Sequence, residues 1–496
     1  MRNLSAAAVL LAVLGAAPGF AGDPVQEAQY PEDAGQLRPW EAGAPAPGAG
    51  LVRTGEQPAF LVEPAAVPVA MTTDMTAPAQ QPPAEAGKDP FFTLDELKAE
   101  MKKLAWTKGD FKVVPYGFLW ATINAESQRT YTGDYAMYVL SPHHAGESEP
   151  AFHVDAKSTR LGLNVSGPQI PCLDCAESGG KVEIDFQGSF VTENKAGLLL
   201  RHAYWEVKDD EFRLLAGQTW DVISPLYPGV LSYSVGWGGG NIGYRRAQFR
   251  IERYLAYSDE LLFTVQGSAN VTVASDFVGN TYVVGDHSGW PILEGRVGAT
   301  LGPRGDGCKP IEFGVSGHIG ELMYDFYHAA DPIPADPHAP PRAVLDASNV
   351  PERTWSFNFD VRIPIGERWG FQGEFFTGEN LGAFLGGVLQ GINVNQPLIS
   401  NPALRRNTIR STGGWLETWY DIRKDLHTHV GYAIDDPFNQ DLDSGRTYNQ
   451  FIFGNLIYDV TDKFIVGVEL TQWKTLWMNK PTGDSFRCEF VAKYGF

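Results

Sequence analysis

Residues 486–496 alternate regularly between apolar and polar side chains. The even positions are apolar or aromatic, whereas the odd positions include Arg487, Glu489 and Lys493. A period of two predicts a β-strand with one apolar and one polar face. A strand between lipid and a watery lumen has this pattern. We therefore interpret the final aromatic residue, Phe496, as an assembly signal of an outer-membrane barrel.

The same alternation recurs along the chain from Lys112 onward. Clear examples are residues 261–271, 311–319 and 355–363, in which apolar and polar positions take turns. About sixteen segments of roughly 10–14 residues show it. A soluble β-sandwich has shorter strands that pack against a core. The pattern predicts an all-β fold, a transmembrane antiparallel β-barrel of about sixteen strands.

The connections between these segments are alternately short and long. Short turns are expected near residues 209–210, 258–259, 366–367, 424–425 and 461–462. Long loops are expected near residues 221–241, 275–289, 325–352, 379–411 and 436–445. Short periplasmic turns and long extracellular loops are typical of outer-membrane barrels. An even number of strands then returns the chain to the periplasmic side.

The N-terminal part has a different character from the barrel. Residues 1–21 have an early Arg2, an apolar run and small residues near the end, as a secretory signal peptide does. Residues 22–90 are rich in Ala and Pro and predict a disordered tether. Residues 91–106 begin with a capping box and predict a short periplasmic helix or coiled coil. The barrel is then expected over residues 110–496, and the sequence has no apolar run long enough for a transmembrane helix.

Composition narrows the class of protein further. The formal net charge is -20, and part of it lies in the N-terminal tail. This charge argues against a nucleic-acid partner, because no basic face dominates. The mean hydropathy of -0.20 fits alternating lipid-facing and lumen-facing positions.

Cysteines and acidic clusters suggest no cofactor. Cys172 and Cys175 form a C-x-x-C pair in a predicted turn, which in an exported protein favours a disulfide over a metal site. A zinc site would need a second ligand pair at suitable spacing. Residues 435–445 contain several aspartates and are expected to form a solvated acidic loop, with a bound cation as the alternative.

The most apolar long loop runs from Asp221 to Asn241 and is expected to bend into the lumen as a constriction. Folding over the barrel rim is the alternative. Its candidate constriction residues are Asp221, Tyr227, Trp237, Gly238, Gly239 and Gly240. The three glycines do not predict a phosphate loop, because no Lys-Ser/Thr pair follows them.

Alternation on the next strand predicts an inward row of polar side chains. Arginines that converge on a pore attract anions and bind carboxylates in a bidentate manner. The candidate pore-lining and selectivity residues are Arg160, Arg213, Arg246, Gln248, Arg250, Glu252, Arg296 and Arg362. Inward acidic residues such as Glu183, Asp185 and Glu294 leave a second interpretation open, a salt-bridge lattice that stiffens the wall.

Several segments resemble DcaP-like porins. The resemblance rests on residues 158–162, 200–204, 215–220 and 243–250, and on the closing Phe496. It implies a sixteen-stranded homotrimer with an N-terminal periplasmic helical segment that passes small anions, dicarboxylates among them. The long Pro/Ala tail and the loops near 325–352 and 379–411 depart from the family pattern.

These observations predict an outer-membrane porin with a bias for small anions. Its expected partners are outer-membrane lipid and lipopolysaccharide, the barrel assembly machinery, small anionic solutes and two further copies of the chain. One alternative is a structural or adhesive barrel with a closed lumen. Another is a barrel enzyme, for which His427 and His429 are the available bases, although no Gly-x-Ser-x-Gly motif accompanies them.

Overall fold

The computed structural model describes residues 106–188, 197–272, 288–304, 309–329, 343–393 and 408–496, with side chains omitted for 325–329 and 343–350. The signal peptide, the tether and almost all of the predicted helix at 91–106 lie outside the described residues. Trp106, the last residue of that segment, already belongs to the first strand. No described helix has both the length and the hydropathy needed to cross a bilayer.

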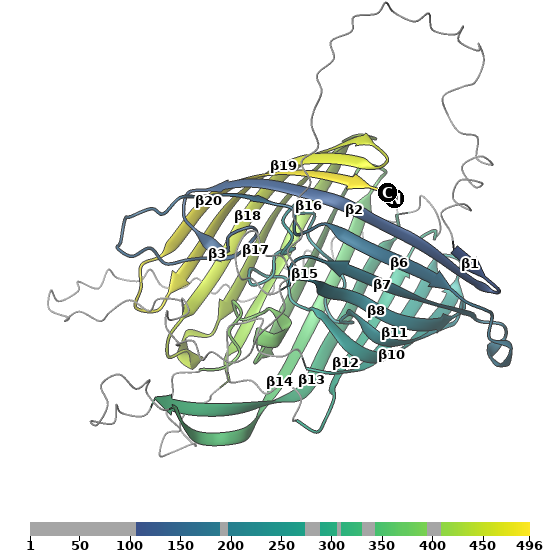
Figure 1. The fold of residues 1–496 in the computed structure, drawn as a ribbon, viewed down its shortest axis with the longest axis horizontal. Coiled ribbons are helices and arrows are strands. Elements are labelled where there is room, and N and C mark those ends of the chain that lie inside the picture. The colour runs from purple at the N-terminus through teal and green to yellow at the C-terminus, as the bar shows by residue number, and fades with distance from the viewer. Residues whose placement is uncertain (1–105, 189–196, 273–287, 305–308, 330–342, 394–407) are drawn as a thin grey trace, which may run out of the picture. The chain divides into compact units, whose positions relative to one another are not determined.

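The described chain is almost entirely β-structure (Figure 1). The main sheet contains β1 (Trp106–Lys108), β2 (Phe111–Glu126), β5 (Ala151–Asp155), β6 (Arg160–Ser166), β7 (Glu177–Asp185), β8 (Leu199–Lys208), β9 (Phe212–Trp220), β10 (Arg245–Ser258), β11 (Leu261–Asn270), β12 (Ile292–Leu301), β13 (Ile311–Ala329), β14 (Ala343–Ile365), β15 (Trp369–Glu379), β16 (Arg410–Arg423), β17 (Leu426–Pro437), β18 (Arg446–Thr461), β19 (Phe464–Trp477) and β20 (Gly483–Gly495). A separate hairpin contains β3 (Thr130–Thr132) and β4 (Ala136–Val139). The described residues also contain three short 3-10 helices, η1 (Pro171–Leu173), η3 (Gly382–Phe384) and η4 (Asn439–Asp441).

Neighbouring strands pair antiparallel, and the sheet closes on itself. Phe118 of β2 pairs with Gly495 of β20, and the Phe496 N–H donates to the Gly117 carbonyl over 3.0 Å. Strands β5 and β6 pair with successive halves of β2, so together they occupy one position in the wall. The result is a closed antiparallel barrel of sixteen strands, which confirms the predicted fold class.

The two faces of the wall follow the alternation in the sequence. On β20, Phe486 and Phe490 are exposed on the outer face, whereas Arg487 and Glu489 are buried inside. The same holds along β10, where Phe249 and Ile251 are exposed outward. An exposed apolar belt on a closed barrel suits a lipid environment, because closure leaves the wall without a free strand edge.

The predicted loop at 325–352 is mostly strand, so this expectation was wrong. β13 and β14 stay paired to Ala329 and Ala343, well beyond the ends of the neighbouring strands (Figure 1). The connection itself is limited to 330–342, which lies outside the described residues. This two-stranded extension forms without further partner strands. The length of the apolar pattern in the sequence could not reveal that these residues continue the two strands.

Candidate pore constriction

The loop at 221–244 lies inside the barrel and follows its inner wall. Its backbone N–H groups at Val222, Leu226, Gly229 and Leu231 donate to four glutamates of the wall. The acceptors are Glu294 of β12 (2.8 Å), Glu374 of β15 (2.7 Å), Glu417 of β16 (2.6 Å) and Glu469 of β19 (2.8 Å). Later in the loop, the Tyr233 hydroxyl donates to Asp185 of β7 over 2.8 Å. The loop therefore contacts strands around most of the barrel before it rejoins β10.

Close approach to the wall explains the glycines of this loop. Gly238 and Gly240 both have positive φ angles, of 71° and 132°. A Cβ atom on Gly240 would lie 2.4 Å from the Gly414 carbonyl oxygen of β16. Beside them, Trp237 is 1% exposed, and a Cβ on Gly239 would lie 2.9 Å from the ring of Phe451. Only glycine lets this backbone lie directly against strands.

Both ends of the loop are held together by Asp221. Its carboxylate accepts the backbone N–H of Tyr244 and the Nε–H of Arg246, each over 2.8 Å. Tyr227, in contrast, is packed against Trp220 with ring centroids 5.1 Å apart, and its carbonyl accepts from Gln372 over 3.0 Å.

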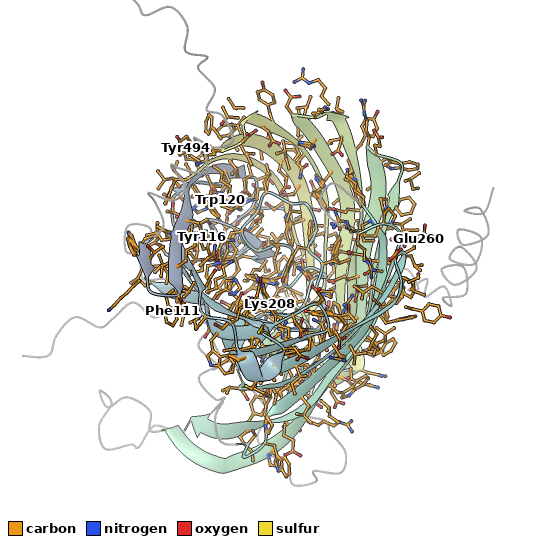
Figure 2. All side chains as sticks on the ribbon, turned by 90° about the vertical axis from the view of Figure 1, so that its right-hand side faces the viewer. Phe111, Tyr116, Trp120, Lys208, Glu260 and Tyr494 are labelled. Atoms are coloured by element: carbon orange, nitrogen blue, oxygen red, sulfur yellow. The ribbon has the colours of Figure 1, made fainter. Side chains whose placement is uncertain are left out.

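Two more loops enter the lumen. One of them belongs to the long loop expected near 379–411, but the sequence patterns did not indicate that either loop turns inward. Residues 127–150, which include β3 and β4, and residues 380–393, which include η3, pack against the loop at 221–244. Their shared apolar cluster contains Tyr135, Met137, Tyr138, Tyr233, Trp237, Tyr244, Leu385, Val388 and Leu389. Figure 2 shows many side chains inside the ring of strands. Their apolar content would have been the available signal, since a solvated loop rarely carries this many aromatic residues.

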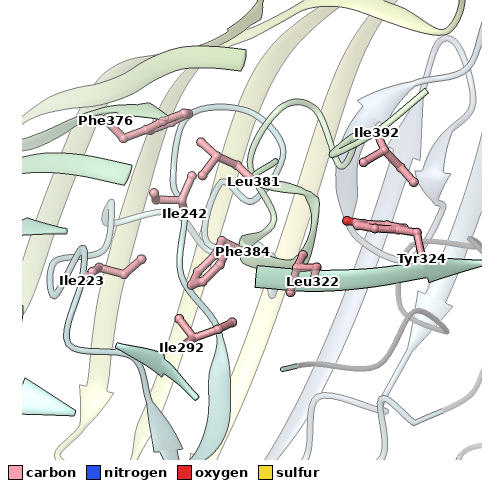
Figure 3. Packing of buried hydrophobic residues seen from close by; sticks show 9 residues of the cluster. All are labelled: Ile223, Ile242, Ile292, Leu322, Tyr324, Phe376, Leu381, Phe384 and Ile392. Carbon is pink, nitrogen blue, oxygen red and sulfur yellow. The ribbon is translucent and has the colours of Figure 1, made fainter. Parts of the chain in front are cut away.

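A second cluster joins loop 380–393 to the wall near β12, β13 and β15. It contains Ile223, Ile242, Ile292, Leu322, Tyr324, Phe376, Leu381, Phe384 and Ile392 (Figure 3). Phe384 lies at the centre of this contact, because the His318 ring stacks on it at 3.8 Å between centroids. The Arg246 guanidinium lies at the same distance from the centroid.

Arg246 is buried among these partners. Besides Asp221 and Phe384, it donates to the Ala383 carbonyl over 2.9 Å, and its side chain is 1% exposed. Glu294 lies 4.0 Å away. The sequence-based interpretation placed Arg246 on the lumen face, where it lies, and its role there is to join two loops to the wall.

The other predicted residues of β9 and β10 form an ion-pair network. Arg213 contacts Glu206 at 2.6 Å and Glu252 at 3.5 Å, while Arg250 contacts Glu252 at 3.3 Å. Gln248 accepts the Nε–H of Arg250 over 2.9 Å. All four predicted residues on β10 lie on the inner face, and Glu252 balances two of the arginines.

The remaining predicted arginines differ from one another. Arg296 forms a bidentate pair with Asp360 at 3.0 and 2.6 Å. Arg362 is exposed, with its guanidinium 5.5 Å from the Trp419 ring centroid. Arg160 lies 5.1 Å from the Phe118 ring centroid.

Strand β8 resolves a register that the sequence left ambiguous. A bulge lies between Glu183/His202 and Ile184/Leu200, so Arg201 is an extra residue in the ladder. Arg201 and His202 are consequently both buried. Arg201 contacts Glu183 at 2.7 Å and Asp185 at 2.8 Å and is a lumen residue that alternation alone missed.

Arg487 of the terminal strand holds loop 127–150 inside the barrel. Its guanidinium donates to the Gly133 and Asp134 carbonyls over 2.8 and 2.7 Å and contacts Glu126 at 2.9 Å. The side chain is buried. Alternation predicts its inward direction, but only the structure shows the loop that it holds.

Besides Arg362, three inward cations that lack an ionic partner in the described part of the chain are Lys493, Arg160 and Arg245. Lys493 lies 4.0 Å from the Phe118 centroid and 5.5 Å from that of Trp120. Arg160 shares the Phe118 ring, and Arg245 lies 4.6 Å from the Trp220 ring. No described carboxylate approaches any of the three within 4.0 Å, and two guanidinium nitrogens of Arg245 have no hydrogen-bond partner among the described residues.

The cysteine and aspartate clusters have other surroundings than expected. Cys172 and Cys175 are exposed free thiols at η1. Asp435 was expected in a solvated loop, which was wrong, because it is buried in β17. It accepts the Val388 N–H of loop 380–393 over 2.8 Å. Asp441 forms a bidentate pair with Arg410 at 2.6 and 2.8 Å.

Comparison with known proteins identifies relatives of the fold. No model of a protein family matches the sequence, and no curated protein is similar to it. Among solved structures, the outer membrane channel DcaP of Acinetobacter baumannii matches with a TM-score of 0.57 and 18% identity, over 79% of this chain and 99% of that chain.

Two further barrels match more distantly. The anion-selective porin from Comamonas acidovorans has a TM-score of 0.46 and 10% identity, over 78% of this chain and 100% of its own. The outer-membrane protein OmpT of Vibrio cholerae has a TM-score of 0.46 and 11% identity, over 79% and 100%. The resemblance to DcaP-like porins inferred from the sequence thus holds for the fold, and this chain has the barrel fold of the DcaP channel.

Proposed function

We propose that this protein is an outer-membrane porin for passive diffusion of small hydrophilic solutes, with a bias for anions. The observation that carries the proposal is a closed barrel with an apolar outer face, a polar inner face and the loop at 221–244 held inside it. A barrel of sixteen strands is wide enough for an aqueous channel that an inward loop narrows.

The anion bias is supported by which cations lack a carboxylate partner. Arg213, Arg246, Arg250 and Arg296 are matched by acids, so their net local charge is small. Arg160 and Lys493 are partly exposed and lie side by side on the Phe118 ring. Cations without a carboxylate ion pair in a narrow lumen attract small carboxylate-class anions.

A structural barrel with a closed lumen is the second candidate. It is favoured by the apolar cluster that loops 127–150, 221–244 and 380–393 build together inside the wall. An enzyme has less support. His427 bonds to Asp421 and Asp459, and His429 bonds to Glu417, so in the described residues each imidazole is engaged by carboxylates rather than by a nucleophile.

The remaining parts of the proposal concern the location of the protein and its oligomeric state. The exposed apolar belt supports an outer-membrane location in contact with lipid and lipopolysaccharide, after export by the signal peptide and insertion by the barrel assembly machinery. A homotrimer follows from the resemblance to DcaP-like porins. Cross-linking of the purified protein in mild detergent tests the trimer. A gel with monomers and no cross-linked trimer would contradict it.

Planar-bilayer recording of the purified protein tests the function. We expect stepwise conductance, a reversal potential biased toward anions under a salt gradient, and flicker when succinate is added. A conducting channel without anion bias would support the porin function and contradict the proposed role of Arg160 and Lys493 in selectivity. Absence of conductance contradicts the porin and supports the closed barrel.

A further inference from the structure

Four glutamates on the inner wall share an arrangement that distinguishes them from the other acids of the lumen. Glu294, Glu374, Glu417 and Glu469 lie on four different strands, and each accepts a backbone N–H from the loop at 221–244. Their exposed fractions are 5, 6, 2 and 1%.

Two of these acids have no cationic partner to explain their presence. In the described residues, no Lys or Arg nitrogen lies within 4.0 Å of Glu374 or Glu469. Their additional donors are neutral, the Trp415 indole at 3.2 Å for Glu374 and the Asn455 amide at 3.0 Å for Glu469. A buried carboxylate is costly unless hydrogen bonds satisfy it. The loop backbone supplies such bonds.

The loop in turn depends on the wall. It contains no regular strand or α-helix, so the four N–H groups that these glutamates accept would be unpaired inside the barrel without them. The wall also donates to the loop, because Asn455 bonds to the Gly229 carbonyl over 2.7 Å and Gln372 to the Tyr227 carbonyl over 3.0 Å. Four N–H groups and two carbonyls of residues 222–231 therefore bond to side chains of the wall.

We propose that these four glutamates are positioning residues that latch the loop at 221–244 to the wall and thereby set the width of the passage. The effect of the latch on transport rests on the proposed porin function. The attachment of the loop to the wall does not depend on that function. The carboxylate oxygens, rather than the negative charges, do the holding. A neutral side chain with a carbonyl oxygen therefore substitutes for glutamate.

The test compares three variants in the full-length protein. Glu417→Leu with Glu469→Leu removes two acceptors, and Glu417→Gln with Glu469→Gln keeps an acceptor oxygen at each position. Asp360→Asn is the matched control, because Asp360 is a wall carboxylate that pairs with Arg296. The single Glu417→Leu variant replaces the double one if the latter does not assemble.

Hydrogen exchange of the peptide spanning 222–231 measures directly whether the loop backbone is still hydrogen-bonded to the wall. Single-channel conductance measures the effect of the latch on the width of the passage. We expect exchange in the leucine variant to be about tenfold faster or more, because each substitution leaves a buried backbone N–H of the loop without its acceptor. Conductance should become larger and noisier. The glutamine variant and the Asp360→Asn control should keep slow exchange.

The outcomes separate the latch from the porin function. Unchanged exchange in the leucine variant overturns the latch. Equal acceleration in the glutamine variant overturns the hydrogen-bond explanation. If exchange accelerates in a barrel that never conducts, the latch stands and the porin proposal fails. If exchange accelerates while the conductance of an active channel stays constant, the latch does not set the width.

Discussion

Two sets of inward cations lie in regions of the barrel with different surroundings. On β8–β12, Arg201, Arg213, Arg246 and Arg296 are each matched by one or two carboxylates. On β20 and β6, Lys493 and Arg160 lie against the ring of Phe118 instead. The first region holds loops and strands together. The second leaves positive charge available to a passing solute.

The difference shows that inward direction does not establish a role in selectivity. A guanidinium that is paired with buried carboxylates is costly to remove, because its partners would be left as unpaired buried charges, and its own field is cancelled nearby. A cation on an aromatic face keeps its charge, because the ring supplies only a weak, uncharged attraction. The interpretation of the inner wall as a salt-bridge lattice therefore suits one region, and the anion-attracting interpretation suits the other.

The largest expected effect comes from breaking the first region. Arg246→Met leaves Asp221 buried without its ion pair and removes the contact with Phe384. We expect a loss of about 3–5 kcal/mol in the free energy of unfolding, since an isolated buried charge is costly. Urea titration of the folded barrel, followed by tryptophan fluorescence, measures it. Stability equal to that of the unmodified protein would contradict the structural role of Arg246.

A smaller effect on stability and a larger one on transport should follow from changing the second region. Arg160→Gln with Lys493→Gln is expected to change the free energy of unfolding by about 1 kcal/mol or less. The anion/cation permeability ratio should fall about twofold. Reversal potentials under a salt gradient measure this ratio, with Arg250→Gln as the matched control. A larger fall in the permeability ratio for Arg250→Gln than for the double variant would contradict the assignment of selectivity to Arg160 and Lys493.

The smallest effect on either region is expected from removing Phe496. Its ring is 53% exposed outside the barrel, and its N–H closes the pair with Gly117. Deletion leaves every inward charge in place, so the conductance and selectivity of assembled barrels should not change. Assembly should slow, as monitored by the heat-modifiable band on gels over time. Normal assembly kinetics would remove the proposed role of Phe496 as a signal.

Much of the fold could be predicted because alternation reports the two faces of a wall. Residues 246, 248, 250 and 252 were placed inward from their apolar neighbours, and they lie there. The same rule failed at Arg201, where a bulge shifts the register by one residue. It also failed for residues 325–352, because strand residues beyond the barrel rim follow the same backbone pairing without a lipid-facing pattern.

The partners of each inward side chain could not be predicted, because they come from distant segments. Glu469 meets Leu231, and Arg487 meets Gly133, only after the sheet has closed and the loops have folded inside it. By itself the sequence determined the number of strands, their faces and the inward direction of most charges, since these depend on local periodicity. The tertiary structure alone decided which charges are neutralised, which hold loops and which remain free for a solute, because burial and pairing depend on contacts across the lumen.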